Sequence, residues 1–325
     1  MSGMFLKLKF LWSMSCPKMA HNGLRLCVCL PLAQGFNLTT NLMGQIAQNR
    51  CYKLAGAVKL KETQTMILRR LGNKSKIASE IQKHFPQHSI YVEPFFGAGG
   101  MFFNKPKVHH NVLNDLDSDV YNLFQMVTTR KQELKEAFKI MPIHSDLLEY
   151  WKENKEEEPI RKALRFIFLS SYVYLGTSGT LSLNAKKNEY PHKFDVNLDF
   201  CHDKLFGCQF ANFDFRKFIS SVSFINDGRD ERGKTLFYAD PPYLETGNNY
   251  SNSFIEQDSI DLFDSLEATG AMFAYSEFDH PFILEQAGKR NLNVITIGER
   301  RNIKNVRTEI LVTNYKKPLS LFDGV

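Results

Sequence analysis

The residues whose types and spacing are best suited to chemistry form two short turns, and the first is Asp240-Pro241-Pro242-Tyr243. This tetrapeptide directly follows the apolar run 236–239, which is typical of a buried strand. The two prolines lack N–H groups, so the carbonyl oxygens beside them stay available as acceptors. A carboxylate, a carbonyl and an aromatic ring suit a planar amine on a nucleobase, which needs two acceptors and a flat surface. A buried turn capped by Asp240 is the alternative interpretation.

The second turn is rich in glycine and follows the strand-like run 89–94. Gly97, Gly99 and Gly100 leave the backbone open to a ligand at a strand's carboxyl end, where open α/β sheets bind their ligands. Asp115 ends the next strand-like run 18 positions after Gly97, the separation expected for a carboxylate that binds ribose hydroxyls. The dinucleotide fingerprint requires a glycine where this chain has Phe102, so NAD is not indicated. The pattern predicts a nucleoside-type ligand, and a tight turn in a packed core is the alternative.

Strand-like and helical patterns alternate from residue 75 onward, which predicts a mostly parallel, doubly wound α/β sheet. The expected strands are 89–94, 111–115, 209–213, 235–239, 271–276, 293–297 and 309–314. The expected helices are 75–85, 120–127, 130–175 with an interruption at 152–158, 259–268 and 281–289. The segment 176–199 is rich in Gly, Ser, Thr, Asn and Lys, and we expect a loop or hairpin there.

The spacing of the two turns predicts an insertion between them. Gly97 and Asp240 are 143 residues apart, whereas three strand–helix units at about 25–30 residues each need far fewer. We therefore expect one domain formed by residues 66–127 and 207–325, interrupted by an inserted helical subdomain over 128–206.

The first 65 residues differ in composition from the rest of the chain. They carry eight Lys or Arg residues against one acidic residue, and four of the six cysteines. The other 260 residues are almost neutral, so the net charge of +6 does not indicate a nucleic-acid partner for the main body. We predict that residues 1–65 are an extension without a fold of its own and that the enzyme begins at Met66. A signal peptide or a targeting presequence is the alternative.

Composition also bounds the class of protein. No run approaches the ~18 apolar residues that a membrane-spanning helix needs. Cysteine and histidine spacing fits neither a disulfide scaffold nor a metal site, so we expect reduced thiols and no metal.

The two turns and the insert between them resemble the Dam-like, D12 class N6-adenine-specific DNA methyltransferases. That family combines a Phe-x-Gly-x-Gly turn, here Phe95 to Gly99, with an Asp-Pro-Pro-Tyr motif. Segments 70–75, 113–119, 213–215, 300–301 and 308–311 are similar to further motifs of the family. The resemblance covers most of residues 66–325 and implies a Rossmann-like methyltransferase fold. It further implies that 66–127 and 207–325 form the catalytic domain, which binds S-adenosyl-L-methionine, and that 128–206 form the target-recognition subdomain.

The resemblance implies an activity and a cofactor. A methyl group would pass from S-adenosyl-L-methionine to the N6 amine of an adenine flipped out of double-stranded DNA, by direct displacement. The implied catalytic residues are Asp240, Pro241, Pro242 and Tyr243, with the amine held by the Asp240 carboxylate and the Pro241 carbonyl and the base stacked on Tyr243. The implied cofactor-binding residues are Arg70, Lys74, Glu93, Pro94, Phe95, Gly97, Gly99, Asp115, Asp214, Phe215 and Asp240.

Two departures from the family concern the surroundings of the cofactor, at Arg70, and the recognition of DNA, at the loop 174–184. Many members have an aromatic residue in place of Arg70, and the usual Asn-Gly-Leu-x-Arg loop is absent from 174–184. The DNA sequence recognised by well-known members is therefore not carried over. Basic residues that could contact DNA phosphates or the major groove, unless they form a solvated charged face, are Lys186, Lys187 and His192 in the insert, and Lys289, Arg290, Arg300, Arg301, Lys304 and Arg307 near the C-terminus.

Partners and rival functions complete the predictions. The tail Pro318 to Phe322 is similar to peptides with which bacterial DNA enzymes bind the replication sliding clamp, unless it packs on its own domain. A cognate restriction endonuclease is a further expected partner, in a restriction-modification system, and the expected location is the cytoplasm of a bacterial cell or phage-infected host. The rival functions are an RNA or protein-amide methyltransferase and a catalytically inactive DNA-binding relative.

Overall fold

A computed structural model describes residues 66–68, 73–174, 179–182, 189–244, 254–301 and 306–316 of the chain, without the side chains of 189, 300, 301 and 306. All of them belong to the compact unit Lys61–Val325. None of the helices in these segments combines the length and the apolar character that crossing a bilayer demands.

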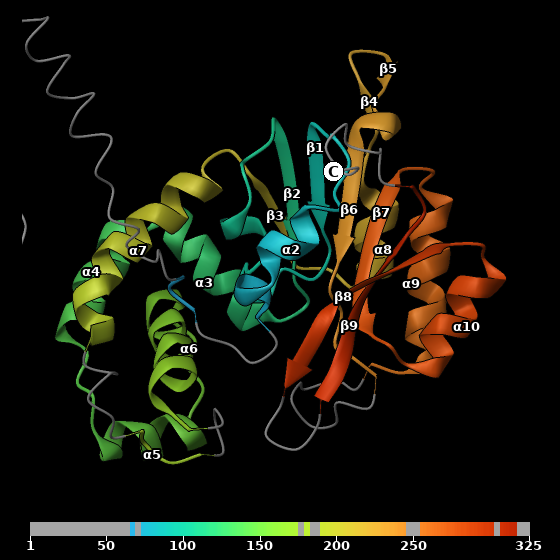
Figure 1. The fold of residues 1–325 in the computed structure, drawn as a ribbon. Helices are drawn as coiled ribbons and strands as arrows, with labels where there is room; N and C mark the ends of the chain where they lie inside the picture. The colour runs from blue at the N-terminus through green and yellow to red at the C-terminus, as the bar shows by residue number, and fades with distance from the viewer. Residues whose placement is uncertain are drawn as a thin grey trace, which may run out of the picture. The chain divides into compact units, whose positions relative to one another are not determined.

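Seven strands form one sheet in the order β3-β2-β1-β6-β7-β9-β8 (Figure 1). Pairing is parallel from β3 to β7, and β9 runs antiparallel to both β7 and β8. The seven expected strands are thereby confirmed, and their bounds are β1 Ile90–Glu93, β2 His110–Asn114, β3 Gln209–Ala211, β6 Thr235–Ala239, β7 Met272–Phe278, β8 Asn293–Arg301 and β9 Val306–Thr313.

The central strands are buried on both faces, which explains their almost uninterrupted apolar sequences. Tyr91 and Tyr238 belong to a core shared with α2 (Ala78–Gln82) and α3 (Ser118–Thr129). Val92 and Phe237, their neighbours along β1 and β6, belong to the core shared with α8 (Phe215–Ser221), α9 (Glu256–Ala268) and α10 (Pro281–Lys289). The sheet is therefore doubly wound, as the alternating pattern predicted.

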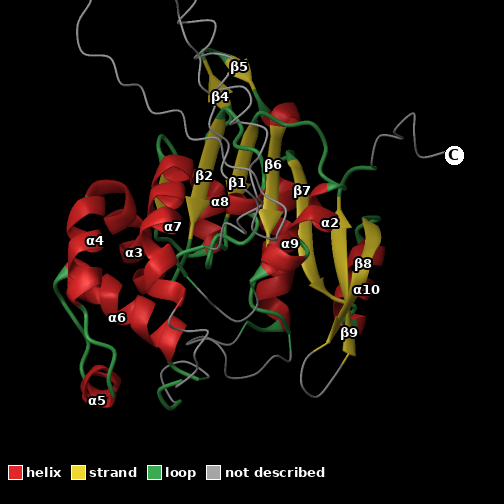
Figure 2. Ribbon diagram, turned by 60° about the vertical axis from the view of Figure 1, so that its left-hand side comes forward, coloured by secondary structure: helices red, strands yellow, loops and turns green. Residues whose placement is uncertain are grey.

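The helices of the insert gather beyond the β2 and β3 edge of the sheet, next to α3 (Figures 1 and 2). They are α4 (Lys131–Ile140), α5 (Ser145–Glu153), α6 (Pro159–Tyr172) and α7 (Glu189–Leu205). Their buried residues, among them Phe168 and Phe194, belong to the same core as Tyr91 of β1. The insert is thus packed onto the sheet domain through a common core.

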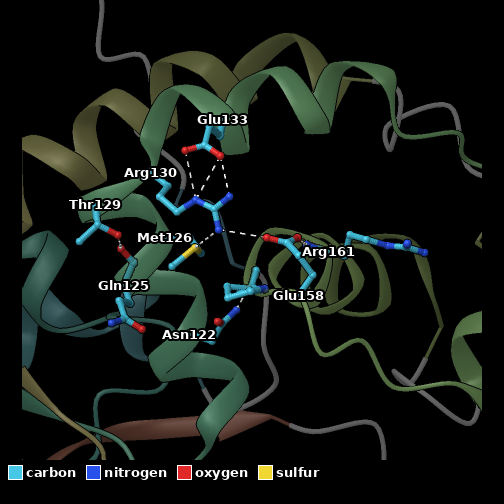
Figure 3. A network of polar contacts seen from close by, with 9 residues as sticks. Asn122, Gln125, Met126, Thr129, Arg130, Glu133, Glu158 and Arg161 are labelled. Carbon is cyan, nitrogen blue, oxygen red and sulfur yellow. Dashed lines mark hydrogen bonds and ion pairs between the residues drawn. The ribbon is translucent and has the colours of Figure 1, made fainter.

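The junction between the sheet domain and the insert is a polar network at the end of α3 (Figure 3). The Arg130 guanidinium donates to Glu133 of α4 and, through Nη1 at 3.0 Å, to Glu158, whose side chain caps α6. Asn122 of α3 donates from Nδ2 to the Pro159 carbonyl at 2.8 Å. These contacts hold the first turns of α4 and α6 against α3.

Some expected elements were wrong. Residues 189–199, expected as loop or hairpin, are helical in α7. Tyr190, Phe194 and Leu198 are buried at intervals of four, and the Asn, Asp and Lys residues between them obscure this period in the sequence. Pro191 does not break the helix because it lies in the first turn, where its missing N–H is not needed. The expected helix 75–85 is instead the 3₁₀ turn η1 (Lys74–Lys76) followed by the short α2.

Two further elements carry no clear pattern in the sequence. Helix α8 begins at Phe215, directly after the expected strand 209–213. A hairpin of β4 (Ile225–Asn226) and β5 (Arg229–Asp230) projects beyond the end of the sheet (Figure 2).

Candidate active site

The two turns lie side by side because β1 and β6 are adjacent and parallel. Ile90 pairs with Thr235 and Val92 with Phe237, so the glycine-rich turn and the Asp-Pro-Pro-Tyr turn leave the same edge of the sheet. The strand order also reverses here, since the chain runs outward from β1 through β2 to β3 and then returns to β6. Such a switch point is where open α/β sheets bind their ligands.

Lys74 connects the two turns. A Cβ atom added to Gly100 would lie 2.1 Å from Asn73 Oδ1 and 2.8 Å from the Lys74 nitrogen, so the backbone at 73–74 packs directly on the glycine-rich turn. The Lys74 side chain is 3% exposed, and its Nζ donates to Asp240 Oδ1 at 2.5 Å. One residue therefore contacts both motifs.

The glycine-rich turn is fixed by the end of the neighbouring strand. Gly97 and Gly99 have φ values of +54° and +73°, which other residues rarely adopt. The Gly97 N–H donates to Asp115 Oδ2 at 2.6 Å, and Asp115 Oδ1 accepts from the Asp117 N–H at 2.9 Å. The carboxylate expected to bind ribose thus lies at the turn, where it also orients the backbone.

Asn114 was not anticipated from the sequence, yet it joins the ends of three strands. Its Nδ2 donates to the Pro94 and Phe213 carbonyls at 2.9 Å each, and its Oδ1 accepts from the Phe213 N–H. It is 1% exposed. The expected site residue Pro94 therefore contributes to the site's framework through its carbonyl.

Aromatic rings border the same edge of the sheet. Phe95 and Phe215, both expected in the cofactor site, lie with their ring centroids 5.5 Å apart. Phe254, which precedes α9 and was not anticipated, lies 6.0 Å from each of them. Asp214 caps α8 by accepting from the Arg216 N–H at 2.9 Å. The three rings form a half-buried apolar surface beside the glycine-rich turn.

Glu93, at the end of β1, is buried rather than open to a ligand. It is 2% exposed and accepts from the Tyr91 hydroxyl at 2.8 Å. Desolvation raises the pKa of its carboxyl well above the usual value. Burial therefore favours the neutral form of this carboxyl and keeps it away from a bound ligand.

Tyr243 is enclosed by the strands behind its turn. Its ring lies 4.7 Å from that of Phe278 at an interplanar angle of 82°, and Lys74 Nζ lies 4.4 Å from its centroid. Its hydroxyl donates to Glu309 of β9. The ring is 9% exposed, so the fold holds it in place on almost every side.

Two buried glutamates on β7 and β9 lie behind the Asp-Pro-Pro-Tyr turn, and the sequence patterns assigned a role to neither. Glu309 accepts from Ser276 Oγ at 2.8 Å as well as from Tyr243. Glu277 accepts from the Leu244 N–H at 3.4 Å, and burial raises the pKa of its carboxyl to about 9. Glu309 lies in the segment 308–311 that is similar to a family motif, but no role followed for its side chain, and Glu277 lies next to the apolar run 272–275 without a motif of its own.

Three of the expected DNA-contacting residues, Lys186, Lys187 and Lys304, lie outside the described part of the chain, as do Arg70 of the expected cofactor site and the tail 318–322. Strands β8 and β9 place the backbones of Arg300 and Arg301 opposite Arg307 and Val306. The Arg307 guanidinium lies 5.4 Å from the Phe278 ring centroid.

The other basic positions are occupied in the fold. Lys289 pairs with Glu285 at 2.6 Å, and Arg290 pairs with Asp264 and Glu267. His192, expected in a loop, is an exposed residue of α7. Across the described ranges, no group of three or more His, Cys, Asp or Glu side chains could hold a metal ion.

Comparison with known proteins gives consistent matches. A family model described as D12 class N6 adenine-specific DNA methyltransferase matches residues 71–309. The DNA adenine methylase of Escherichia coli (strain K12) is 26% identical over 183 residues, which cover 53% of this chain and 62% of that protein. The DNA adenine methylase of Vibrio cholerae is 24% identical over 223 residues, covering 63% of this chain and 77% of that protein. The match therefore spans about three fifths of the length of the E. coli relative.

Among solved structures, the rRNA methyltransferase aviRa from Streptomyces viridochromogenes aligns with 78% of this chain and 93% of its own. The identity is 12% and the TM-score 0.39, so the fold assignment rests on the strand order instead.

Proposed function

The chain belongs to the family of D12 class N6 adenine-specific DNA methyltransferases, and from that premise we propose that it methylates the N6 amine of adenine in double-stranded DNA. The observation that carries the proposal is the meeting of the glycine-rich turn and the Asp-Pro-Pro-Tyr turn at the switch point of the sheet, with Lys74 between them.

The residues at this edge fit S-adenosyl-L-methionine as the cofactor. When bound, it supplies a methyl group activated by a sulfonium charge. The backbone of Gly97 leaves room for close approach, because a Cβ atom added there would meet nothing within 4 Å, and Asp115 supplies a carboxylate for ribose hydroxyls. At Gly99 the space of a side chain is filled by the Phe96 and Phe103 rings, so this glycine lets the turn pack on them. Phe95, Phe215 and Phe254 offer an apolar surface for a flat ring, and Arg70 and Lys74 lie in the preceding segment.

The residues of the Asp-Pro-Pro-Tyr turn would act on the adenine. Extrusion of the base from the duplex costs a few kcal/mol, and contact with an aromatic ring such as Tyr243 returns about 1–3 kcal/mol. The Asp240 carboxylate and the Pro241 carbonyl accept hydrogen bonds from the amine and orient its lone pair toward the methyl group. Alignment of the reactants contributes roughly 7–11 kcal/mol of barrier lowering. Asp240 need not be a strong base, because the proton becomes acidic only as the new bond forms.

Transfer of a radiolabelled methyl group to duplex DNA tests the function. Label in the N6 position of adenine of duplex DNA supports it. Label in RNA or in a protein amide would instead identify the chain as an RNA methyltransferase or a protein-amide methyltransferase. No transfer to any of these acceptors by a folded, cofactor-binding protein would identify an inactive DNA-binding relative.

The chain's basic residues supply its contacts with DNA. Lys186 and Lys187 of the insert and Arg300, Arg301, Lys304 and Arg307 around the β8–β9 hairpin are assigned to phosphates or the groove. Their replacement by Gln one at a time should weaken DNA binding without changing cofactor affinity.

Partners beyond DNA follow from the tail and the family. Residues Pro318 to Phe322 are assigned to the sliding clamp, which a pull-down with and without residues 318–325 tests. A cognate endonuclease and action in the cytoplasm, at the chromosomal DNA, complete the proposal. Purification of tagged protein from expressing cells would reveal the nuclease as a co-purifying activity.

The domain boundaries in the proposal place the start of the enzyme at Met66. Met66, Ile67 and Leu68 are at most 8% exposed, and the Ile67 carbonyl accepts from the Tyr190 hydroxyl of α7. The fold therefore includes residues 66–68. Residues 1–65 are assigned to an extension outside the enzyme, and mass spectrometry of the native N-terminus tests this.

A further inference from the structure

A buried carboxylate lies behind the proposed catalytic turn, that of Glu309 on β9. Three polar groups from three separate elements meet it. The Tyr243 hydroxyl donates to it, Ser276 Oγ of β7 donates to it at 2.8 Å, and Lys74 Nζ lies 3.5 Å away. The side chain is 1% exposed. The function proposed above does not yet use this residue.

Stability alone does not explain a charged side chain at this position. A buried carboxylate loses several kcal/mol of hydration, and well-packed apolar residues often replace a buried ion pair without loss of stability. The neighbours of Glu309 on β9, Ile310 and Leu311, are apolar and fully enclosed. By contrast, the three polar groups named above are tied to the proposed catalytic turn: Tyr243 belongs to it, Lys74 pairs with Asp240, and Ser276 contacts the Tyr243 hydroxyl.

Lys74 lies between two carboxylates at unequal distances. Its Nζ is 2.5 Å from Asp240 and 3.5 Å from Glu309. An ammonium group bound only to Asp240 would occupy an oxygen that must accept from the adenine amine. A second carboxylate within reach keeps the buried ammonium neutralised when Asp240 turns to the amine.

We propose that Glu309 is a positioning residue for methyl transfer, which anchors the Tyr243 hydroxyl and retains the Lys74 ammonium while Asp240 binds the amine. The inference rests on the function proposed above. It concerns the transfer step itself rather than the binding of cofactor or DNA, because none of the three contacts reaches the glycine-rich turn except through Lys74.

The Glu309→Gln variant tests the proposal, because its amide still accepts from the two hydroxyls but carries no charge. We expect the single-turnover rate of methylation at saturating cofactor and duplex DNA to fall at least 30-fold. The dissociation constants for S-adenosyl-L-methionine and DNA should stay within threefold of wild type. The Glu309→Asp variant keeps the charge and should be faster than Glu309→Gln. The logarithm of its rate should lie at least one third of the way from that of Glu309→Gln back to that of wild type.

A matched control is Glu156→Gln in the insert. Its carboxylate is also largely buried, accepts from Trp151 Nε1 at 2.8 Å and pairs with Arg161. It lies far along the chain from both turns, and its variant should methylate at the wild-type rate.

The outcomes separate the two proposals. Wild-type protein that methylates no duplex DNA refutes the function. Active wild-type protein with a Glu309→Gln rate within threefold of it refutes only the positioning role, as does a loss confined to cofactor or DNA affinity. If Glu309→Gln does not fold, Tyr243→Phe is compared instead, since it keeps both charges and removes one held hydroxyl. Its transfer rate should fall at least tenfold, and a rate within threefold of wild type would overturn the proposal.

Discussion

Lys74 Nζ donates a 2.5 Å hydrogen bond to Asp240 Oδ1, although the two residues are 166 positions apart. The pair joins the segment that precedes the first strand to the turn that follows the central strand β6. Because the Lys74 backbone also packs on Gly100, the same residue determines the distance between the glycine-rich turn and the carboxylate. The geometry of the site therefore depends on one buried ion pair.

Replacement of Asp240 should separate catalysis from folding. We expect Asp240→Ala to lower the methyl-transfer rate at least 1,000-fold while it retains a folded, cofactor-binding protein. Lys74 keeps a carboxylate 3.5 Å away in Glu309, so the loss of unfolding free energy should be about 1–3 kcal/mol rather than larger. Circular dichroism, calorimetric binding of the cofactor and the radiolabel assay measure the three quantities. Turnover close to that of wild type would end the assignment of Asp240.

A methyl group at Gly100 should disturb the link between the turns. Its Cβ would lie 2.1 Å from Asn73 Oδ1 and 2.8 Å from the Lys74 backbone nitrogen, so the 73–74 segment must move and carry the Lys74 side chain with it. We expect Gly100→Ala to lose about 1–3 kcal/mol of stability and at least tenfold in cofactor affinity.

Gly288→Ala is the matched control for Gly100→Ala. It lies in α10 with no atom within 4 Å of the added carbon, and should gain about 0.5–1 kcal/mol. Urea denaturation of both variants tests the difference, and equal stabilities would contradict it.

The aromatic surface beside the glycine-rich turn should contribute to cofactor affinity. Phe254 lies 6.0 Å from Phe95 and from Phe215, and loss of such a ring contact is worth about 1 kcal/mol. We expect Phe254→Ala to raise the dissociation constant for S-adenosyl-L-methionine about five- to tenfold. Phe224→Ala is the control, because this half-buried ring packs at the opposite end of β6, 6.1 Å from Phe237. Equal effects of the two substitutions on affinity would argue against the assignment.

The buried Glu277 should make stability fall as pH rises. Burial raises the pKa of its carboxyl from 4.5 to about 9, so the folded protein keeps a proton that the unfolded chain releases. Between these two pKa values the unfolded state binds fewer protons than the folded state. The contribution of Glu277 to the free energy of unfolding therefore falls, as pH rises, by at most about 1.4 kcal/mol per pH unit.

The Glu277→Gln variant removes this titration. Relative to wild type, the variant should become steadily more stable from pH 5 to pH 8 in urea denaturation. A stability difference that does not change with pH would show that Glu277 is ionised in the folded protein.

The seven strands of the main sheet and helices α9 and α10 were predictable because each depends on a local pattern, whereas α8 and the β4–β5 hairpin were not. The strand of Leu236 to Ala239 is a continuous apolar run, and helix α10 begins at a proline and carries a regular apolar face. Helix α7 was not predictable from composition, because Asn, Asp and Lys residues surround the buried positions of Tyr190 and Phe194. Its helical structure comes from packing against the core of the insert.

The sequence by itself determined the order of strands and helices and the two motifs at the carboxyl ends of β1 and β6. These features can be read from the sequence because apolar periodicity, glycine and proline determine the backbone conformation of a few neighbouring residues. Only the tertiary structure decided that Lys74 meets Asp240, that Asn114 joins three strand ends and that Glu309 lies behind Tyr243. These contacts depend on which strands become neighbours, above all on β9 pairing between β7 and β8, and no local pattern encodes that choice.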